Sequence, residues 1–103
     1  MMDKITIQLN YTRAINQSRK IYDLAAQLRK IANSELQSAM NNLSHDWNGE
    51  SASAFLKKAQ KANEDLLKNA QQLTSTASAI RKCAENIRNS ELKALEIINQ
   101  KSC

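Results

Sequence analysis

HDWNGESASAF, residues 45–55, holds the only Trp, the only Gly, the only Phe and the only His of a chain of 103 residues that contains no proline. Gly49 is the one residue of the chain that adopts a left-handed backbone without steric cost, and Asn48 before it is the next most tolerant. The Asn48-Gly49 pair therefore predicts the point at which one helix ends and the chain reverses.

The residues around this pair are suited to restarting a helix. Asp46 or Ser51 can accept a backbone N–H bond and cap the second helix. Ala52 and Phe55 are then expected to begin its core stripe. Trp47 lies at the tip of the turn, where its ring can cover the end of the core.

Helical periodicity extends on both sides of a turn at about residues 44–50. Over about residues 11–43, apolar residues recur mostly at steps of three and four, at Ile15, Ile21, Leu24, Leu28, Ile31, Leu36, Met40 and Leu43. Over about residues 51–98 the spacing stays close to the coiled-coil period of 3.5, through Ala52, Phe55, Ala59, Ala62, Leu66, Ala70, Leu73, Ala77, Ile80, Ala84, Ile87, Ala94 and Ile98. These patterns predict two long helices.

The residues before the first helix show a different pattern. Ile5, Ile7 and Leu9 alternate with polar residues, which predicts a short extended segment. Asn10 or Thr12 can then cap the helix that follows.

The expected fold class is all-α, with one domain over residues 1–103 that forms an antiparallel two-helix hairpin. Many of the stripe positions are alanine, so the core of a single hairpin is thin. A dimer that forms a four-helix bundle is the natural way to bury the remaining apolar residues. The residues predicted to form the dimer or partner interface are Ile21, Leu24, Leu28, Ile31, Leu66, Leu73, Ile80 and Ile87.

Composition narrows the possible partners. No apolar run approaches the roughly 20 residues of a membrane span, and the first residues lack the pattern of a cleaved signal peptide.

The net charge is +5, but acidic and basic residues alternate at helical spacing, as with Lys61 and Asp65. Nucleic acid is therefore not expected as a partner. Arg13, Arg19, Lys20, Arg81, Lys82 and Arg88 could gather into a basic patch away from the turn, although a solvated face explains them better.

No constellation of residues indicates catalysis, a cofactor or a metal. His45 has an acidic neighbour but no nucleophile or set of ligands, which predicts a solvated histidine. Cys83 falls on or beside the core stripe, where it would act as a small apolar residue, and Cys103 is the last residue. The chain is therefore predicted not to be an enzyme.

Trp47-Asn48-Gly49 is a W-x-G tripeptide at the midpoint of a chain of about a hundred residues, and a run of small residues follows it up to Phe55. In these features, and in the helical pattern on each side, the whole chain resembles the WXG-hundred (ESAT-like) family. The resemblance implies a small helical hairpin that forms homodimers or heterodimers. It also implies export in the folded state, without a cleaved signal peptide, by the type VII (ESX-like) secretion system of Gram-positive bacteria and mycobacteria.

The same resemblance implies two kinds of role and partner. Some members of the family are secreted factors, and others escort a larger effector. The expected partner is another small helical protein or the helical N-terminal domain of a secreted effector, together with the secretion machinery. Trp47, Asn48 and Gly49 would form the turn or export motif.

The sequence departs from the family in its tail. The Y-x-x-x-D/E export motif is absent, and the nearest substitutes place Ile87 four residues before Glu91 and Leu92 four before Glu96. A partner that supplies the missing motif in a heterodimer would explain the gap. An alternative hypothesis is an intracellular basic helical adaptor that binds an acidic protein or nucleic acid.

Overall fold

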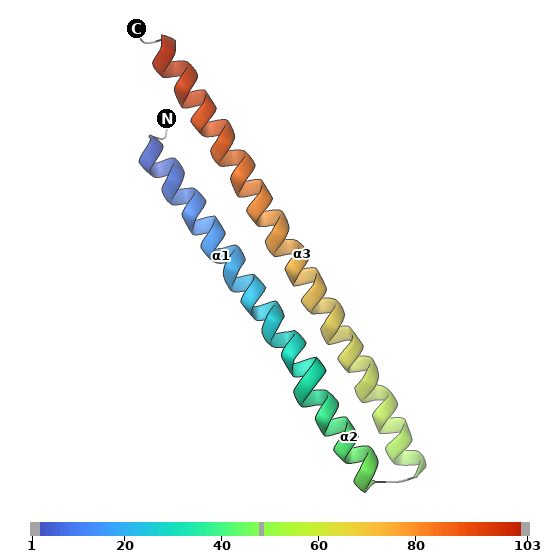
Figure 1. Cartoon of the computed structure of the whole chain (residues 1–103). Coiled ribbons are helices and arrows are strands. Elements are labelled where there is room, and N and C mark those ends of the chain that lie inside the picture. Colours follow the sequence, from blue (N-terminus) through green and yellow to red (C-terminus); the bar gives the residue numbers. More distant parts are fainter. Residues whose placement is uncertain (1–2, 48, 102–103) are drawn as a thin grey trace. The chain divides into compact units, whose positions relative to one another are not determined.

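The computed structural model describes residues 3–47 and 49–101, and within these residues the chain is helical with no strand. Four elements follow one another, as Figure 1 shows. They are α1 (Lys4–Lys30), the π-helical segment η1 (Ile31–Leu36), α2 (Gln37–Asp46) and α3 (Glu50–Lys101). The all-α class and the helical hairpin, with helices on both sides of the W-x-G turn, are confirmed.

The predicted extended segment over Ile5, Ile7 and Leu9 is wrong, because these residues lie in the first two turns of α1. The short alternation of apolar and polar residues does not decide between strand and helix. In the helix, Ile7 is buried, whereas Ile5 and Leu9 are exposed on another face. The segment has no neighbouring strand among the described residues, and one buried side chain ties it to the core as a helix.

The helix cap also differs from the prediction. Asp3 precedes α1, and its Oδ1 accepts a hydrogen bond of 2.8 Å from the Thr6 backbone N–H. The Asp3 carbonyl accepts a second bond, of 3.0 Å, from the N–H of Ile7. Asn10 and Thr12 lie inside the helix and not at its start. Asp3 therefore satisfies donors that the first turn of a helix otherwise leaves unpaired.

This cap predicts a pH dependence at the start of α1. The hydrogen bonds from the backbone and then the side chain of Thr6 hold the pKa of Asp3 below its ordinary value of 3.8. A lowered pKa in the folded state means that the cap stabilises the helix above pH 3.8 and is lost as the pH falls through the lower value. We expect the Thr6 amide shift in an NMR titration to move with a midpoint below 3.8. Asp3→Asn keeps a capping oxygen without the charge, and a titration that survives this change would contradict the assignment.

The described chain divides into two compact units, each of which pairs a segment before the turn with one after it. Unit 1 comprises residues 1–21 and 75–103, and unit 2 comprises residues 22–74. Within each unit the two segments run antiparallel (Figure 1). The expectation of a single domain over residues 1–103 stays a prediction.

The seam between the helices is made mostly of small side chains. In unit 1 the buried residues are Ile7, Ile15, Ser18, Ala77 and Ala84. In unit 2 they are Ala25, Ala32, Met40, Ala52, Asn63 and Ala70. Small side chains allow two helix axes to approach closely, but each buried methyl group contributes only about 0.8 kcal/mol. Apart from Ile7, Ile15 and Met40, the larger apolar residues are left at the margins of the seam.

The π-helical segment η1 changes the spacing of the buried residues in unit 2. Ala25 and Ala32 are seven residues apart, whereas Ala32 and Met40 are eight apart. A π turn contains one more residue than an α-helical turn. The extra residue in η1 therefore brings Met40, and not the exposed Ala39, to the seam.

Candidate functional site

The W-x-G turn is built by three backbone features. The N–H of Trp47 donates a 2.9 Å hydrogen bond to the Leu43 carbonyl, and Trp47 itself is extended, with φ −128° and ψ 114°. Gly49 has φ +121°, and the N–H of Ser53 donates a 3.1 Å bond to its carbonyl. Gly49 thus occupies the cap position of α3, so neither Asp46 nor Ser51 caps this helix as the sequence had suggested. Asn48 lies outside the described residues.

The backbone conformation of Gly49 predicts that adding a single methyl group at this position lowers the stability of the chain. An added Cβ would meet no atom within 4 Å, so any cost of Gly49→Ala comes from the backbone and not from a clash. A non-glycine residue held in a rarely populated backbone conformation costs about 1–3 kcal/mol. We expect Gly49→Ala to lower the free energy of unfolding by that amount in urea denaturation. D-alanine, which favours positive φ, should preserve stability; equal losses for the two would contradict a backbone origin.

Trp47 and Phe55 form an exposed aromatic pair beside this turn. Their ring centroids lie 6.1 Å apart with an interplanar angle of 52°, a tilted arrangement typical of favourable aromatic contacts. Trp47 is 42% exposed and Phe55 is 52% exposed. The core stripe of α3 starts with the buried Ala52, whereas Phe55 packs on the tryptophan outside the core.

A groove runs along the first turns of α3 next to this pair. Its apolar wall comes from Trp47, Ala52 and Leu56, and its polar wall includes Lys57 and Gln60. An apolar surface with a few polar groups at its rim is suited to a protein segment. The groove therefore offers a contact surface beside the turn.

None of the eight residues predicted for the dimer or partner interface is buried. In unit 1, Ile21 and Ile80 are half-buried and Ile87 is exposed. In unit 2, Leu28, Leu66 and Leu73 are half-buried, whereas Leu24 and Ile31 are exposed. Each unit thus leaves several large aliphatic side chains at the margins of its seam.

Unit 2 contains a polar link across the seam that sequence analysis did not find. Arg29 Nη2 donates a hydrogen bond to Thr74 Oγ1, and that hydroxyl donates a 3.0 Å bond to the Ala70 carbonyl. The link joins α1 to α3 next to the fully buried Ala70. No periodicity marks these two residues, because contact between them depends on the register of the two helices.

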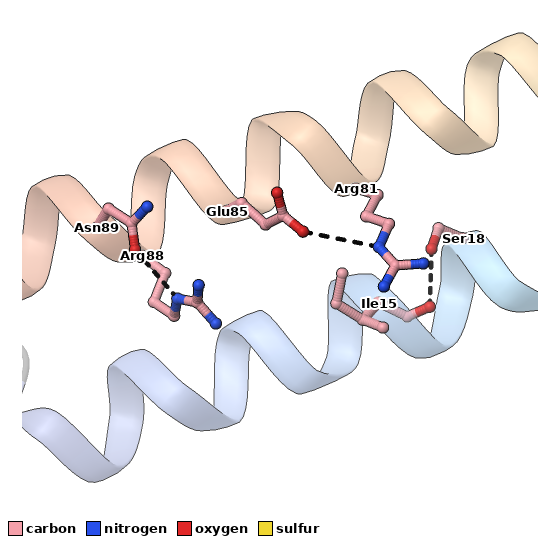
Figure 2. A network of polar contacts seen from close by, with 6 residues as sticks. All are labelled: Ile15, Ser18, Arg81, Glu85, Arg88 and Asn89. Atoms are coloured by element: carbon pink, nitrogen blue, oxygen red, sulfur yellow. Dashed lines mark hydrogen bonds and ion pairs between the residues drawn. The ribbon is translucent and has the colours of Figure 1, made fainter.

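Unit 1 is held by contacts of a different kind. The guanidinium carbon of Arg88 lies 4.0 Å from the centre of the Tyr11 ring, which joins α3 to α1 by a cation–π contact. Figure 2 shows the polar contacts along the same segments. Arg81 Nε lies 3.6 Å from Glu85 Oε1, and the Ser18 hydroxyl donates a 2.8 Å bond to the Ile15 carbonyl. The last bond explains how a serine is accommodated in the seam.

Asn63 is the one buried side chain with an unsatisfied polar atom in the described part of the chain. It is 8% exposed, and its Oδ1 has no hydrogen-bond partner among the described residues. The sequence had placed Ala62 in the core stripe, but Ala62 is exposed and Asn63 is buried instead. The signal that would have found it is the seven-residue step from Ala84 and Ala77 through Ala70 back to position 63.

The other groups singled out in the sequence are His45 and the two cysteines. His45 is exposed in the last turn of α2, and Cys83 is an exposed free thiol, so its predicted place in the core is wrong. Cys103 lies outside the described residues. No group of three His, Cys, Asp or Glu side chains in the described ranges could hold a metal ion. None of the described helices combines the length and apolar character that crossing a bilayer requires.

Comparison with known proteins gives one match. The family model WXG100, described as "Proteins of 100 residues with WXG", matches residues 6–92. The matched stretch takes in most of α1, the turn and most of α3. No curated protein and no solved structure matches the chain.

Proposed function

We propose that this chain, which belongs to the WXG100 family, is exported by a type VII secretion system or escorts a larger effector to it. Proteins of this family are small, non-enzymatic helical proteins of type VII secretion that pair with other helical proteins. The proposed role depends on two surfaces of this chain: the apolar margins of the seam and the W-x-G turn.

The exposure of large aliphatic residues is the observation that best supports this proposal. Leu24 is 50% exposed and Ile87 is 52% exposed, while alanines occupy six of the eleven buried positions of the described chain. Burying an exposed leucine or isoleucine side chain contributes about 1.5–3 kcal/mol. A second pair of helices laid on these margins would bury them and complete a four-helix bundle. The second pair comes from another copy, a small helical protein or the N-terminal helical domain of an effector.

The turn supplies the second surface. Trp47 and Phe55 hold each other in place, remain half exposed, and border a groove with an apolar wall. A Trp that only closed the end of a core would be largely buried. Its exposure supports a role in recognition by a partner chain or by the secretion machinery.

Export is tested by an immunoblot of the native host's culture supernatant, with and without the secretion ATPase, and with a cytoplasmic protein as a lysis control. We expect the chain in the supernatant only when the ATPase is present. Trp47→Ala should abolish this appearance, while His45→Ala, an exposed neighbour in α2, should not. Circular dichroism of both variants checks that they fold. Retention of the wild-type chain in cells with all partner genes expressed would contradict export and favour the intracellular adaptor.

Dimerisation is tested independently of export. Leu24→Glu places a charge among the apolar margins of unit 2, and we expect it to weaken association with the copurified partner or second copy by at least about 30-fold. Gln27→Glu adds a similar charge to an exposed position of the same helix and should change association little. Sedimentation velocity measures both. Equal affinities for the two variants would place the interface elsewhere.

A further inference from the structure

The net charge of the chain is distributed unevenly between its two units. Unit 1 holds nine of the fifteen Lys and Arg residues but only four of the ten Asp and Glu residues. Unit 2 holds the remaining six basic and six acidic residues. The whole excess of +5 therefore belongs to unit 1. Between Lys4 and Tyr22 the chain has no acidic residue at all.

One face of α1 within unit 1 combines this positive charge with exposed apolar residues. Ile5, Leu9, Arg13, Asn16 and Lys20 follow one another at steps of four and three, which places them on one side of the helix. All five are exposed, and Ile5 and Leu9 are 79% and 48% exposed. We call these five residues the outer face of α1.

The outer face lies away from the seam. Residues two positions apart along a helix differ in direction by about 160°, because each residue turns the helix by about 100°. Ile7 and Ile15 are buried against α3, so Ile5 and Leu9, each two positions from Ile7, point to the opposite side. A partner on the outer face would not need to open the helix pair.

We propose that the outer face of α1 binds the surface of a membrane that contains anionic phospholipids. Ile5 and Leu9 enter the boundary between headgroups and acyl chains, while Arg13 and Lys20 contact phosphate groups along the same side of the helix. A helix face that combines apolar side chains with Lys and Arg, and lacks acidic residues, is suited to this position. Such binding is peripheral, which agrees with the lack of a spanning helix in the described part of the chain. It goes beyond the proposed role in secretion and does not depend on it.

The chemistry of the face favours lipid over other anionic partners. Single-stranded nucleic acid is usually bound by exposed aromatic rings on which bases stack. The one aromatic residue of unit 1 is Tyr11, and Arg88 already covers a face of its ring. An acidic protein would satisfy Arg13 and Lys20 but gives no reason for an isoleucine that is 79% exposed in the first turn. A lipid surface takes both kinds of side chain at once.

Vesicle flotation tests the proposal with the full chain. The probes are vesicles of phosphatidylcholine alone and of phosphatidylcholine with about 30% phosphatidylglycerol, at about 50 mM and about 300 mM NaCl. We expect binding to the anionic vesicles only, and weaker binding at the higher salt concentration. Arg13→Glu/Lys20→Glu should lower the partition coefficient more than about tenfold.

Two matched control variants test whether vesicle binding depends on the outer face, on net charge alone or on nonspecific contact with exposed apolar residues. Lys57→Glu/Lys58→Glu makes the same change in charge at exposed positions of unit 2, and it should lower partition less than about threefold. Ile5→Ser/Leu9→Ser should weaken binding at both salt concentrations, whereas Phe55→Ser should not. Circular dichroism checks that each variant is helical.

Several results would overturn the proposal. Equal loss with both charge-reversal pairs would show that net charge alone attracts the chain to vesicles. Equal partition into neutral and anionic vesicles would remove the role of Arg13 and Lys20. Tighter binding to a DNA duplex than to the anionic vesicles, at the same salt concentration and with the same dependence on these residues, would identify nucleic acid as the partner. None of these results would contradict the proposed export or dimerisation, because those are tested with variants at Trp47 and Leu24.

Discussion

Deleting Ser34 should leave the helix pair folded, although removal of one residue from the middle of a helix is usually destructive. Ser34 lies in η1, whose extra residue makes the step from Ala32 to Met40 eight residues long. Without Ser34 that step becomes seven, which matches the spacing of Ala25 and Ala32. An ordinary α-helix then carries the same buried residues to the same seam. We expect the free energy of unfolding to change by no more than about 1 kcal/mol.

The matched deletion is that of Gln71, an exposed residue of α3 in the same unit. It shortens the step from Ala70 to Ala77 from seven residues to six, and it rotates the rest of α3 by about 100° relative to the seam. No π turn in α3 can absorb the change. The packing energy lost should exceed the free energy of unfolding, which is about 5–15 kcal/mol for small domains. We therefore expect this deletion to unfold the chain. Thermal melts followed by circular dichroism compare the two. Unfolding by both deletions would show that η1 is not an insertion relative to the seam.

The π turn also shows what could be read from the sequence. From Ile21 to Ile31 the stripe of the first helix runs at steps of three and four, and its next member is Leu36, five positions later. A step of five is too long for an α-helical stripe, and it coincides with η1. The helices themselves could be predicted because their periodicity is sustained over many turns. The π-helical segment could have been predicted only if the five-residue step had been interpreted as a sign of an irregular helical turn.

The identity of the buried residues was harder to predict, for a physical reason. Hydrophobicity favours Leu24 and Phe55 as core residues, yet both are half exposed, and the seam is filled by Ala25 and Ala52 instead. At positions where two helices approach closely, as at Ala25 and Ala52, a larger side chain would force the axes apart, although the seam also admits Ile7, Ile15 and Met40 elsewhere. A seam that buries alanines beside exposed leucines therefore misleads an analysis based on hydrophobicity alone.

The candidate site also has one part that the sequence predicts and one part that it does not. The W-x-G turn could be predicted because only glycine suits the backbone at position 49, and the structure gives Gly49 a φ of +121°. The contact between Arg29 and Thr74 could not, because it depends on which residues of α1 and α3 face each other. Local backbone chemistry is thus readable from the sequence, and contacts between distant segments require the register.

Ala70→Leu should be the most damaging single substitution in unit 2. Ala70 is fully buried in the seam, and its carbonyl accepts the Thr74 hydroxyl that also binds Arg29. A leucine there adds three carbons to a space that fits one methyl group, so the helices must separate or the side chain must adopt a strained rotamer. Overpacking of this kind costs about 1–3 kcal/mol, and loss of the hydrogen bond from Arg29 to Thr74 across the seam adds about 0.5–1.5 kcal/mol. The sum, about 1.5–4.5 kcal/mol, is a large fraction of the roughly 5–15 kcal/mol that stabilises a small domain.

Ala62→Leu is the matched control, because it makes the same substitution on the same helix at an exposed position. Leucine and alanine are both good helix formers, so we expect the control to remain within about 0.5 kcal/mol of the wild-type chain in urea denaturation. If close approach of the helices limits side-chain size, Ala70→Leu alone should lower the midpoint. It should do so whether or not a partner covers the margins, since the seam lies within the unit. Equal stability of the two variants would mean that the helices lie far enough apart to admit a leucine, and that the alanines are there for another reason.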